Sequence, residues 1–103
     1  MFSNLEQKAV LKFMDSLIKA DNLIDNREVN YLEELMYSFS FQTKNLNDLD
    51  TISRSEAIDI LKTMSTDKKN TFINMLTAIS ESDNNVDIVE EKLLYELRKI
   101  LAL

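Results

Sequence analysis

The sequence predicts an all-α protein: one compact helical bundle of about six helices, in which a helix-loop-helix unit occurs twice. Three observations lead to this prediction. The chain has no glycine and no proline, and its apolar residues, 45% of the total, recur at the three- and four-residue spacing of helices. In addition, an acidic pattern, Asp-Asn-x-Ile/Val-Asp-x-x-Glu, begins at Asp21 and again at Asp83.

The two acidic patterns lie 62 residues apart, and the apolar residues around them keep the same interval. When an acidic pattern and the spacing of the apolar residues around it repeat at the same interval, an internal duplication is indicated. We predict one domain over 1–103, with repeat halves at roughly 4–39 and 66–103 and a variable middle at 40–65. The matched pairs are Val10 with Phe72, Phe13 with Met75, Met14 with Leu76, Leu17 with Ile79, Leu32 with Leu94 and Leu35 with Leu97.

The first half reads as a pair of helices. Over 4–20 an apolar stripe predicts one buried helix face, which Leu5 extends toward the start of the chain. Asp25 stands three residues before Glu28, the spacing of a capping box, so a second helix is expected to begin there and to continue to Phe39. The short connection makes the two helices neighbours.

The middle and the second half are expected to hold the remaining helices. A weaker pattern predicts a short helix over 43–49, and Ser53 with Glu56 is expected to cap a helix that ends near Ser65. Ser65 or Thr66 would cap the duplicate of the first helix. A last helix follows the second acidic segment, capped by Asp87 and Glu90.

Composition excludes several classes of function. Eighteen acidic against twelve basic residues give a net charge of −6 without a basic cluster, so nucleic acid and anionic membrane surfaces are poor partners. The chain has no cysteine and no histidine, which removes thiol nucleophiles, the commonest general base and the commonest transition-metal ligand. We therefore expect no enzyme and no catalytic residues. With no membrane-spanning run, we expect no membrane insertion and a cytoplasmic location.

Carboxylates gather in the two acidic segments and invite two interpretations. Hard cations bind several oxygen ligands close together, but an EF-hand would need glycine where Ile88 stands and glutamate where Leu94 stands. Helix capping explains each repeated residue without an ion, so capping is the favoured interpretation. The metal-ligand candidates of the alternative, a weak divalent-cation sensor or buffer, are Asp21, Asp25, Glu28, Asp83, Asp87 and Glu90.

Segments 20–28 and 82–90 resemble the twice-occurring Ala-Asp-Gly-x-Ile/Val-x-x-x-Glu signature of the TerB-like domain, known from tellurite-resistance proteins and membrane-anchored DnaJ-type co-chaperones of bacteria. The resemblance covers nearly the whole chain. It implies a helical bundle with internal pseudo-symmetry, a bacterial source, and a non-enzymatic module with metal-linked, stress-response or partner-docking roles. The acidic signature positions carried over are Asp21, Glu28, Asp83 and Glu90.

Asn22 and Asn84 depart from that signature by replacing its glycine. Asparagine tolerates the left-handed backbone, so in this glycine-free chain we expect asparagines, Asn26 among them, to occupy such positions. The expected function is an acidic surface that binds a protein partner. Neither the partner nor the oligomeric state is predicted, but Tyr37 and Tyr95 are expected to be half-exposed and to mark a contact surface.

Overall fold

The structure, a computed structural model, describes residues 1–19, 26–81 and 88–103. In these residues the chain forms six α-helices and one 3₁₀ turn, in agreement with the predicted fold class. The elements are α1 (Asn4–Ile18), α2 (Asn26–Ser38), α3 (Thr43–Asn47), η1 (Leu49–Thr51), α4 (Arg54–Thr63), α5 (Thr66–Glu81) and α6 (Ile88–Ile100).

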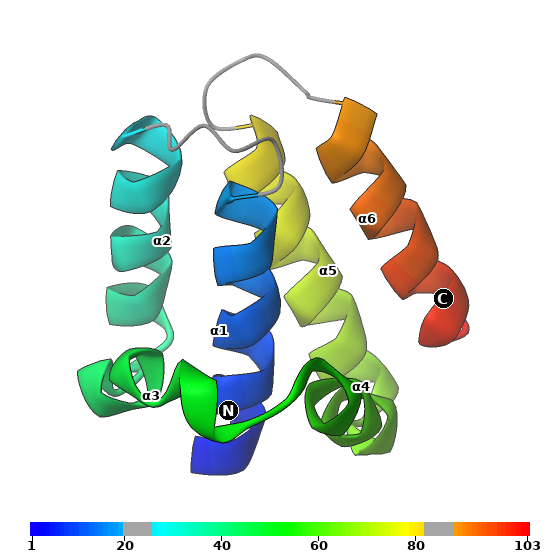
Figure 1. The fold of residues 1–103 in the computed structure, drawn as a ribbon, viewed down its shortest axis with the longest axis horizontal. Helices are drawn as coiled ribbons and strands as arrows, with labels where there is room; N and C mark the ends of the chain where they lie inside the picture. Colours follow the sequence, from blue (N-terminus) through cyan, green and yellow to red (C-terminus); the bar gives the residue numbers. More distant parts are fainter. Residues whose placement is uncertain (20–25, 82–87) are drawn as a thin grey trace.

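Two helix pairs make up most of the bundle (Figure 1). The helices α1 and α5 run side by side in the same direction at its centre, and α2 and α6 return in the opposite direction on either side. The short elements α3, η1 and α4 cross the end of the bundle where α1 and α5 begin. As a result, the ends of α1 and α5 and the starts of α2 and α6 all lie at the opposite end.

Side-chain caps explain where several helices begin. At Ser53 the hydroxyl accepts from the amide of Glu56, and the Glu56 carboxylate accepts from the amide of Ser53, which confirms the predicted capping box. The same reciprocal pair joins Ser3 and Glu6 at the start of α1. The hydroxyl of Ser65 accepts from the amide of Lys68, so Ser65 is the cap of α5.

Helix boundaries recur at the 62-residue interval of the sequence repeat. The starting residues Asn4 of α1 and Thr66 of α5 obey this interval, and so do the ends of α2 and α6. Ser40 and Ala102, also 62 residues apart, are the two described residues with positive φ, at 57° and 58°. These coincidences support a duplication of the helix pair, which stays a proposal.

Both left-handed residues end a helix in the same way. The amide of Ser40 donates to the carbonyl of Tyr37, and the next amide, that of Phe41, donates to Met36. This is the Schellman arrangement, and the residues after α6 repeat it. The prediction that asparagines occupy the left-handed positions is wrong for Asn26, which lies in α2. Asn22, Asn84 and Asn85 are outside the described residues.

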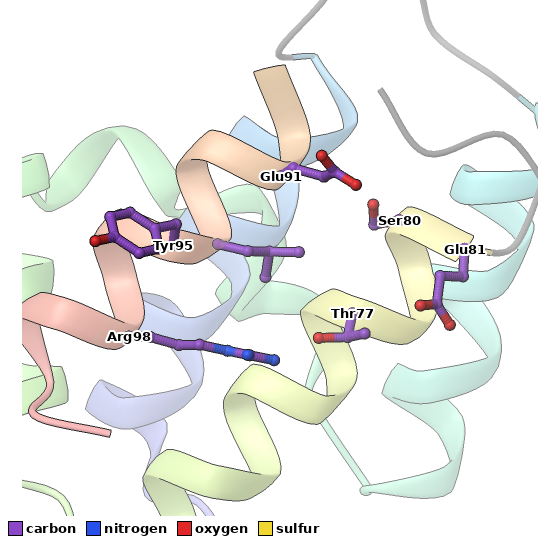
Figure 2. A pocket seen from close by; sticks show the side chains of 7 residues that line it. Thr77, Ser80, Glu81, Glu91, Tyr95 and Arg98 are labelled. Carbon is purple, nitrogen blue, oxygen red and sulfur yellow. The ribbon is translucent and has the colours of Figure 1, made fainter. Parts of the chain in front are cut away.

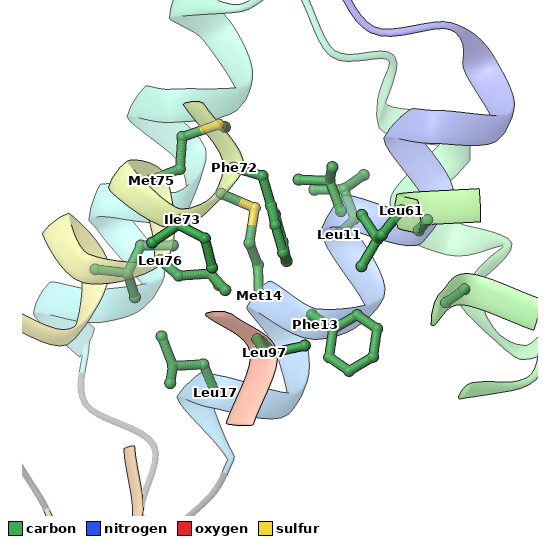
Figure 3. Close-up of a cluster of buried hydrophobic side chains, with 14 of the residues drawn as sticks. Leu11, Phe13, Met14, Leu17, Leu61, Phe72, Ile73, Met75, Leu76 and Leu97 are labelled. Carbon is green, nitrogen blue, oxygen red and sulfur yellow. The ribbon is translucent and has the colours of Figure 1, made fainter. Parts of the chain in front are cut away.

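The hydrophobic core lies between α1 and α5 and is closed by the other helices (Figure 3). The rings of Phe13 and Phe72, both fully buried, meet edge to face with centroids 6.4 Å apart. The guanidinium of Arg54 in α4 lies 5.3 Å from the centroid of the Phe13 ring. The predicted stripe of α1 is buried as expected, but Leu5 is 57% exposed and does not extend it.

Buried polar contacts hold α3 and η1 against α1. The side-chain oxygen of Gln7 accepts from the amide of Gln42 at 3.0 Å and from Nδ2 of Asn45 at 2.8 Å, and its Nε2 donates to the carbonyl of Phe2. Farther along α1, Nζ of Lys12 donates to the carbonyl of Leu49 in η1 at 3.0 Å. The variable middle of the chain therefore has a fixed position on α1.

A cross-bundle ion pair joins the first turns of α1 and α5. Nζ of Lys68 lies 2.8 Å from Oε1 of Glu6, with 30% and 16% of the two side chains exposed. Burial by itself raises the pKa of Glu6, but the hydrogen bonds from Lys68 and the Ser3 amide and the charge of Lys68 outweigh it. The pKa of Glu6 is therefore lower than its ordinary value of 4.5.

Candidate functional site

Two of the six carboxylates predicted to form the acidic site are described, and both are buried. Glu28 is 4% exposed and Glu90 is 1% exposed, each in the first turn of its helix. They were expected to contribute to an acidic surface, and for these two residues that expectation is wrong. Asp21, Asp25, Asp83 and Asp87 lie outside the described residues, so their capping and metal-ligand roles stay predictions.

The burial of Glu90 connects α6 to α5. Its Oε2 accepts a hydrogen bond from Oγ of Ser80, which is 1% exposed, at 3.0 Å. Ser80 comes 62 residues after Ile18, so the second helix pair has a buried hydroxyl where the first has an apolar side chain. A buried carboxylate is costly without a donor, and Ser80 provides one to Glu90.

A surface groove runs beside this contact, between α5 and α6 (Figure 2). Its volume is about 240 Å³. Glu91 lies toward the end where α6 begins, and Arg98 lies toward the other end, so the groove has carboxylates and a guanidinium at separate places. The lining residues are Thr77, Ser80, Glu81, Glu91, Leu94, Tyr95 and Arg98.

The outer side of α6 carries exposed apolar residues next to the groove. Ile88 is 77% exposed, Val89 45% and Tyr95 68%, and together with Glu91 and Lys92 they line a shallow hollow. Tyr95 borders both the hollow and the groove. Large apolar side chains that meet at one place on a surface are typical of contact sites for other molecules. We refer to Ile88, Val89 and Tyr95 as the α6 apolar patch.

The two tyrosines expected to be half-exposed are more exposed than that. Tyr37, on α2, is 89% exposed and stands apart from the α6 apolar patch, so the pair does not form one surface. The groove was not predicted from the sequence, because residues of two separate helices line it.

The described residues show a groove and an apolar patch but no grouped metal ligands. Among them, no three acidic residues come together in a way that could hold a metal ion. Within the same ranges, no helix is long and apolar enough to cross a membrane. The fold and the site together define the class: an all-helical domain with a groove between its last two helices and an apolar patch on the last one.

Comparison with known proteins adds information on the fold alone. No protein-family model matches the chain, and no curated protein matches it. A solved structure is similar over the full length: the crystal structure of PG1108, a protein of unknown function from Porphyromonas gingivalis W83. The TM-score is 0.85 with 24% sequence identity, and the match covers 100% of this chain and 81% of that chain. The helical arrangement is thus one that a bacterial protein adopts.

Proposed function

We propose that this chain is a non-enzymatic protein-interaction module of the TerB-like type, which binds a protein partner through α6. The observation that carries the proposal is the α6 apolar patch. Ile88 and Tyr95 together keep most of their side-chain surface in water, although burial would stabilise both. Tyrosine is also enriched among the residues that dominate binding at protein interfaces. The sequence resemblance supplies the TerB-like part of the proposal.

Fewer carboxylates are available for an acidic binding surface than the sequence suggested. Glu28 and Glu90 are buried, so they do not face a partner. Asp21 and Asp83, outside the described residues, stay candidates for the acidic surface. A net charge of −6 favours a basic or neutral partner over another acidic one.

Capture of a partner by variants of the patch tests this proposal. The tagged chain with Ile88→Ser or Tyr95→Ser is compared with the unchanged chain in binding a partner that is first isolated from the native bacterial host and then purified. We expect each variant to weaken binding by about tenfold, because a buried interface anchor contributes more than about 1 kcal/mol. Tyr37→Ser is the matched control, since this exposed tyrosine on α2 lies outside the patch. Equal binding by all three variants would contradict the proposal.

A weak divalent-cation site is the second candidate function. Two carboxylates buried at equivalent positions, Glu28 and Glu90, motivate it, and Ser80 is a donor to Glu90. Millimolar calcium, magnesium or manganese should then raise the unfolding temperature, since a ligand bound to the folded state alone stabilises it. Unchanged unfolding at all three metals would remove this candidate.

A further inference from the structure

The α5–α6 groove has a counterpart on the first helix pair. Five of its lining residues come 62 residues after five that line a groove between α1 and α2. Three of these pairs matter here: Lys19 with Glu81, Val29 with Glu91, and Leu32 with Leu94. The two grooves thus lie at the same place on equivalent helices, and they differ in the other elements and the charged residues that line them.

The groove of the first helix pair has a third wall supplied by the chain itself. Leu46, Leu49 and Asp50, from α3 and η1, line it together with α1 and α2. Leu46 and Leu49 pack against the core, and Lys12 holds the carbonyl of Leu49 at 3.0 Å. In the α5–α6 groove every lining residue belongs to α5 or α6, so within the described chain the corresponding wall is missing.

We infer that the α5–α6 groove binds a short amphipathic helix of a partner protein, placed beside α5 and α6 as α3 and η1 are placed beside α1 and α2. This inference rests on the proposed function and names the site and the kind of partner segment. Short helices commonly bind in grooves through aliphatic residues three or four positions apart. Leu46 and Leu49 show that spacing in the groove that is already walled.

The charges around the groove specify the partner segment further. On the first helix pair, Lys19 and Asp50 line the same groove, and Nζ of Lys19 lies 3.1 Å from Oδ2 of Asp15 in α1. On the second, Glu81 takes the place of Lys19, and Glu91 adds another carboxylate. The partner helix should therefore carry lysine or arginine where η1 carries Asp50. An acidic residue at its other end would face Arg98, which lies away from Glu91 in Figure 2.

Two synthetic peptides make this charge rule testable. One has the sequence of residues 42–52 of this chain, and the other has the same sequence with lysine in place of Asp50. Each is titrated into the full chain and followed by NMR at assigned backbone amides. We expect the lysine peptide to bind about tenfold more tightly and to shift Thr77, Leu94 and Arg98. Shifts confined to Lys19 and Leu32 would mean that the peptide replaces α3 and η1, and would overturn the inference.

Variants of the groove provide the controls. Glu81→Lys should reverse the preference, so that the unmodified peptide binds more tightly. Thr77→Arg should abolish binding of the lysine peptide by filling the groove, whereas Asn70→Arg, exposed on α5 two turns away, should leave it unchanged. Circular dichroism confirms that each variant is folded. Equal binding of both peptides by all forms of the chain would overturn the inference.

The experiments distinguish an error in the groove assignment from an error in the proposed function. If Ile88→Ser loses the partner while neither peptide binds the groove, the interaction function stands and the groove assignment is wrong. If the lysine peptide binds as expected while Ile88→Ser captures the partner like the unchanged chain, the groove assignment stands and the α6 apolar patch is not the binding surface.

Discussion

Ser40 and Ala102 hold the left-handed backbone conformation in a chain that has no glycine. A side chain with a Cβ atom pays roughly 1–2 kcal/mol for this conformation, whereas glycine adopts it freely. Both residues nevertheless make the same pair of backbone hydrogen bonds after their helices. The position of the turn is thus set by the end of the helix, and after Ser40 also by the buried Phe41, so the residue in the turn is not the best one available.

The first prediction concerns the replacement of Ser40 and Ala102 by glycine. Ser40→Gly and Ala102→Gly should each raise the free energy of unfolding by about 1 kcal/mol, because the left-handed strain is removed. Thermal denaturation should show an increase of about 4–8 °C for each. Ser38→Gly is the control, since Ser38 is exposed in the last turn of α2 and has helical geometry, where glycine should lower stability by about 0.5–1 kcal/mol. A loss of stability at position 40 or 102 would contradict the argument.

The second prediction concerns the ion pair of Glu6 and Lys68. The folded protein lowers the pKa of Glu6 below 4.5, so this carboxylate stabilises the fold above that pH and loses its contribution as the pH falls through the lowered value. Glu6→Gln should therefore cost about 1 kcal/mol at pH 7 and almost nothing near pH 2. Urea denaturation of Glu6→Gln, Lys68→Gln and the double variant between these pH values measures the effect. If the losses in unfolding free energy of the two single variants add up to that of the double variant at pH 7, the two side chains are not coupled.

At the scale of elements, a buried amide decides where the variable middle of the chain lies. Gln7 receives hydrogen bonds from the start of α3 and from Asn45 inside it, so one α1 side chain fixes a five-residue helix. Such a helix is too short to be stable by itself. Its position could not be predicted from its own weak apolar pattern, because the partner that orders it is 35 residues away in the sequence.

The third prediction tests this anchor. Gln7→Met keeps the volume but leaves the amide of Gln42 without its acceptor and leaves Nδ2 of Asn45 with Oδ1 of Asn4 alone, at 3.3 Å, so we expect a loss of roughly 1–3 kcal/mol in the free energy of unfolding. The amide of Gln42 should also exchange with solvent faster. Gln42→Met is the control, since the Gln42 side chain makes no cap hydrogen bond and the backbone amide remains. Unchanged exchange at position 42 in Gln7→Met would contradict the role of Gln7 as an anchor.

Elements with strong periodic patterns were predicted close to their observed bounds. The stripe from Val10 to Ile18 and the Ser53–Glu56 capping box are local signals, and both appear as expected. Burial of Glu28 and Glu90 was not predicted, because a glutamate three residues after an aspartate reads as an exposed cap. Whether it is buried depends on the neighbouring helix: for Glu90, the hydroxyl of Ser80 on α5.

For the whole molecule, the sequence predicted the fold class but not the relative direction of the two helix pairs. That direction brings α1 and α5 side by side and places the starts of α2 and α6 at one end of the bundle (Figure 1). It follows from contacts such as that of Phe13 with Phe72, which joins residues of the two halves. The candidate groove could not be predicted either, since it is visible only when the two helix pairs are compared in space.

The last prediction follows from this shared core. Phe13 of α1 contacts Phe72 of α5 and Arg54 of α4, so the first helix pair, the middle and the second helix pair meet at one ring. Phe13→Ala should cost about 3–5 kcal/mol and destabilise α2 and α6 by the same amount. If the loss prevents folding, Phe13→Leu gives a smaller effect of the same kind. Hydrogen exchange measures the two helices separately, and a loss confined to α2 would mean that the two pairs unfold independently.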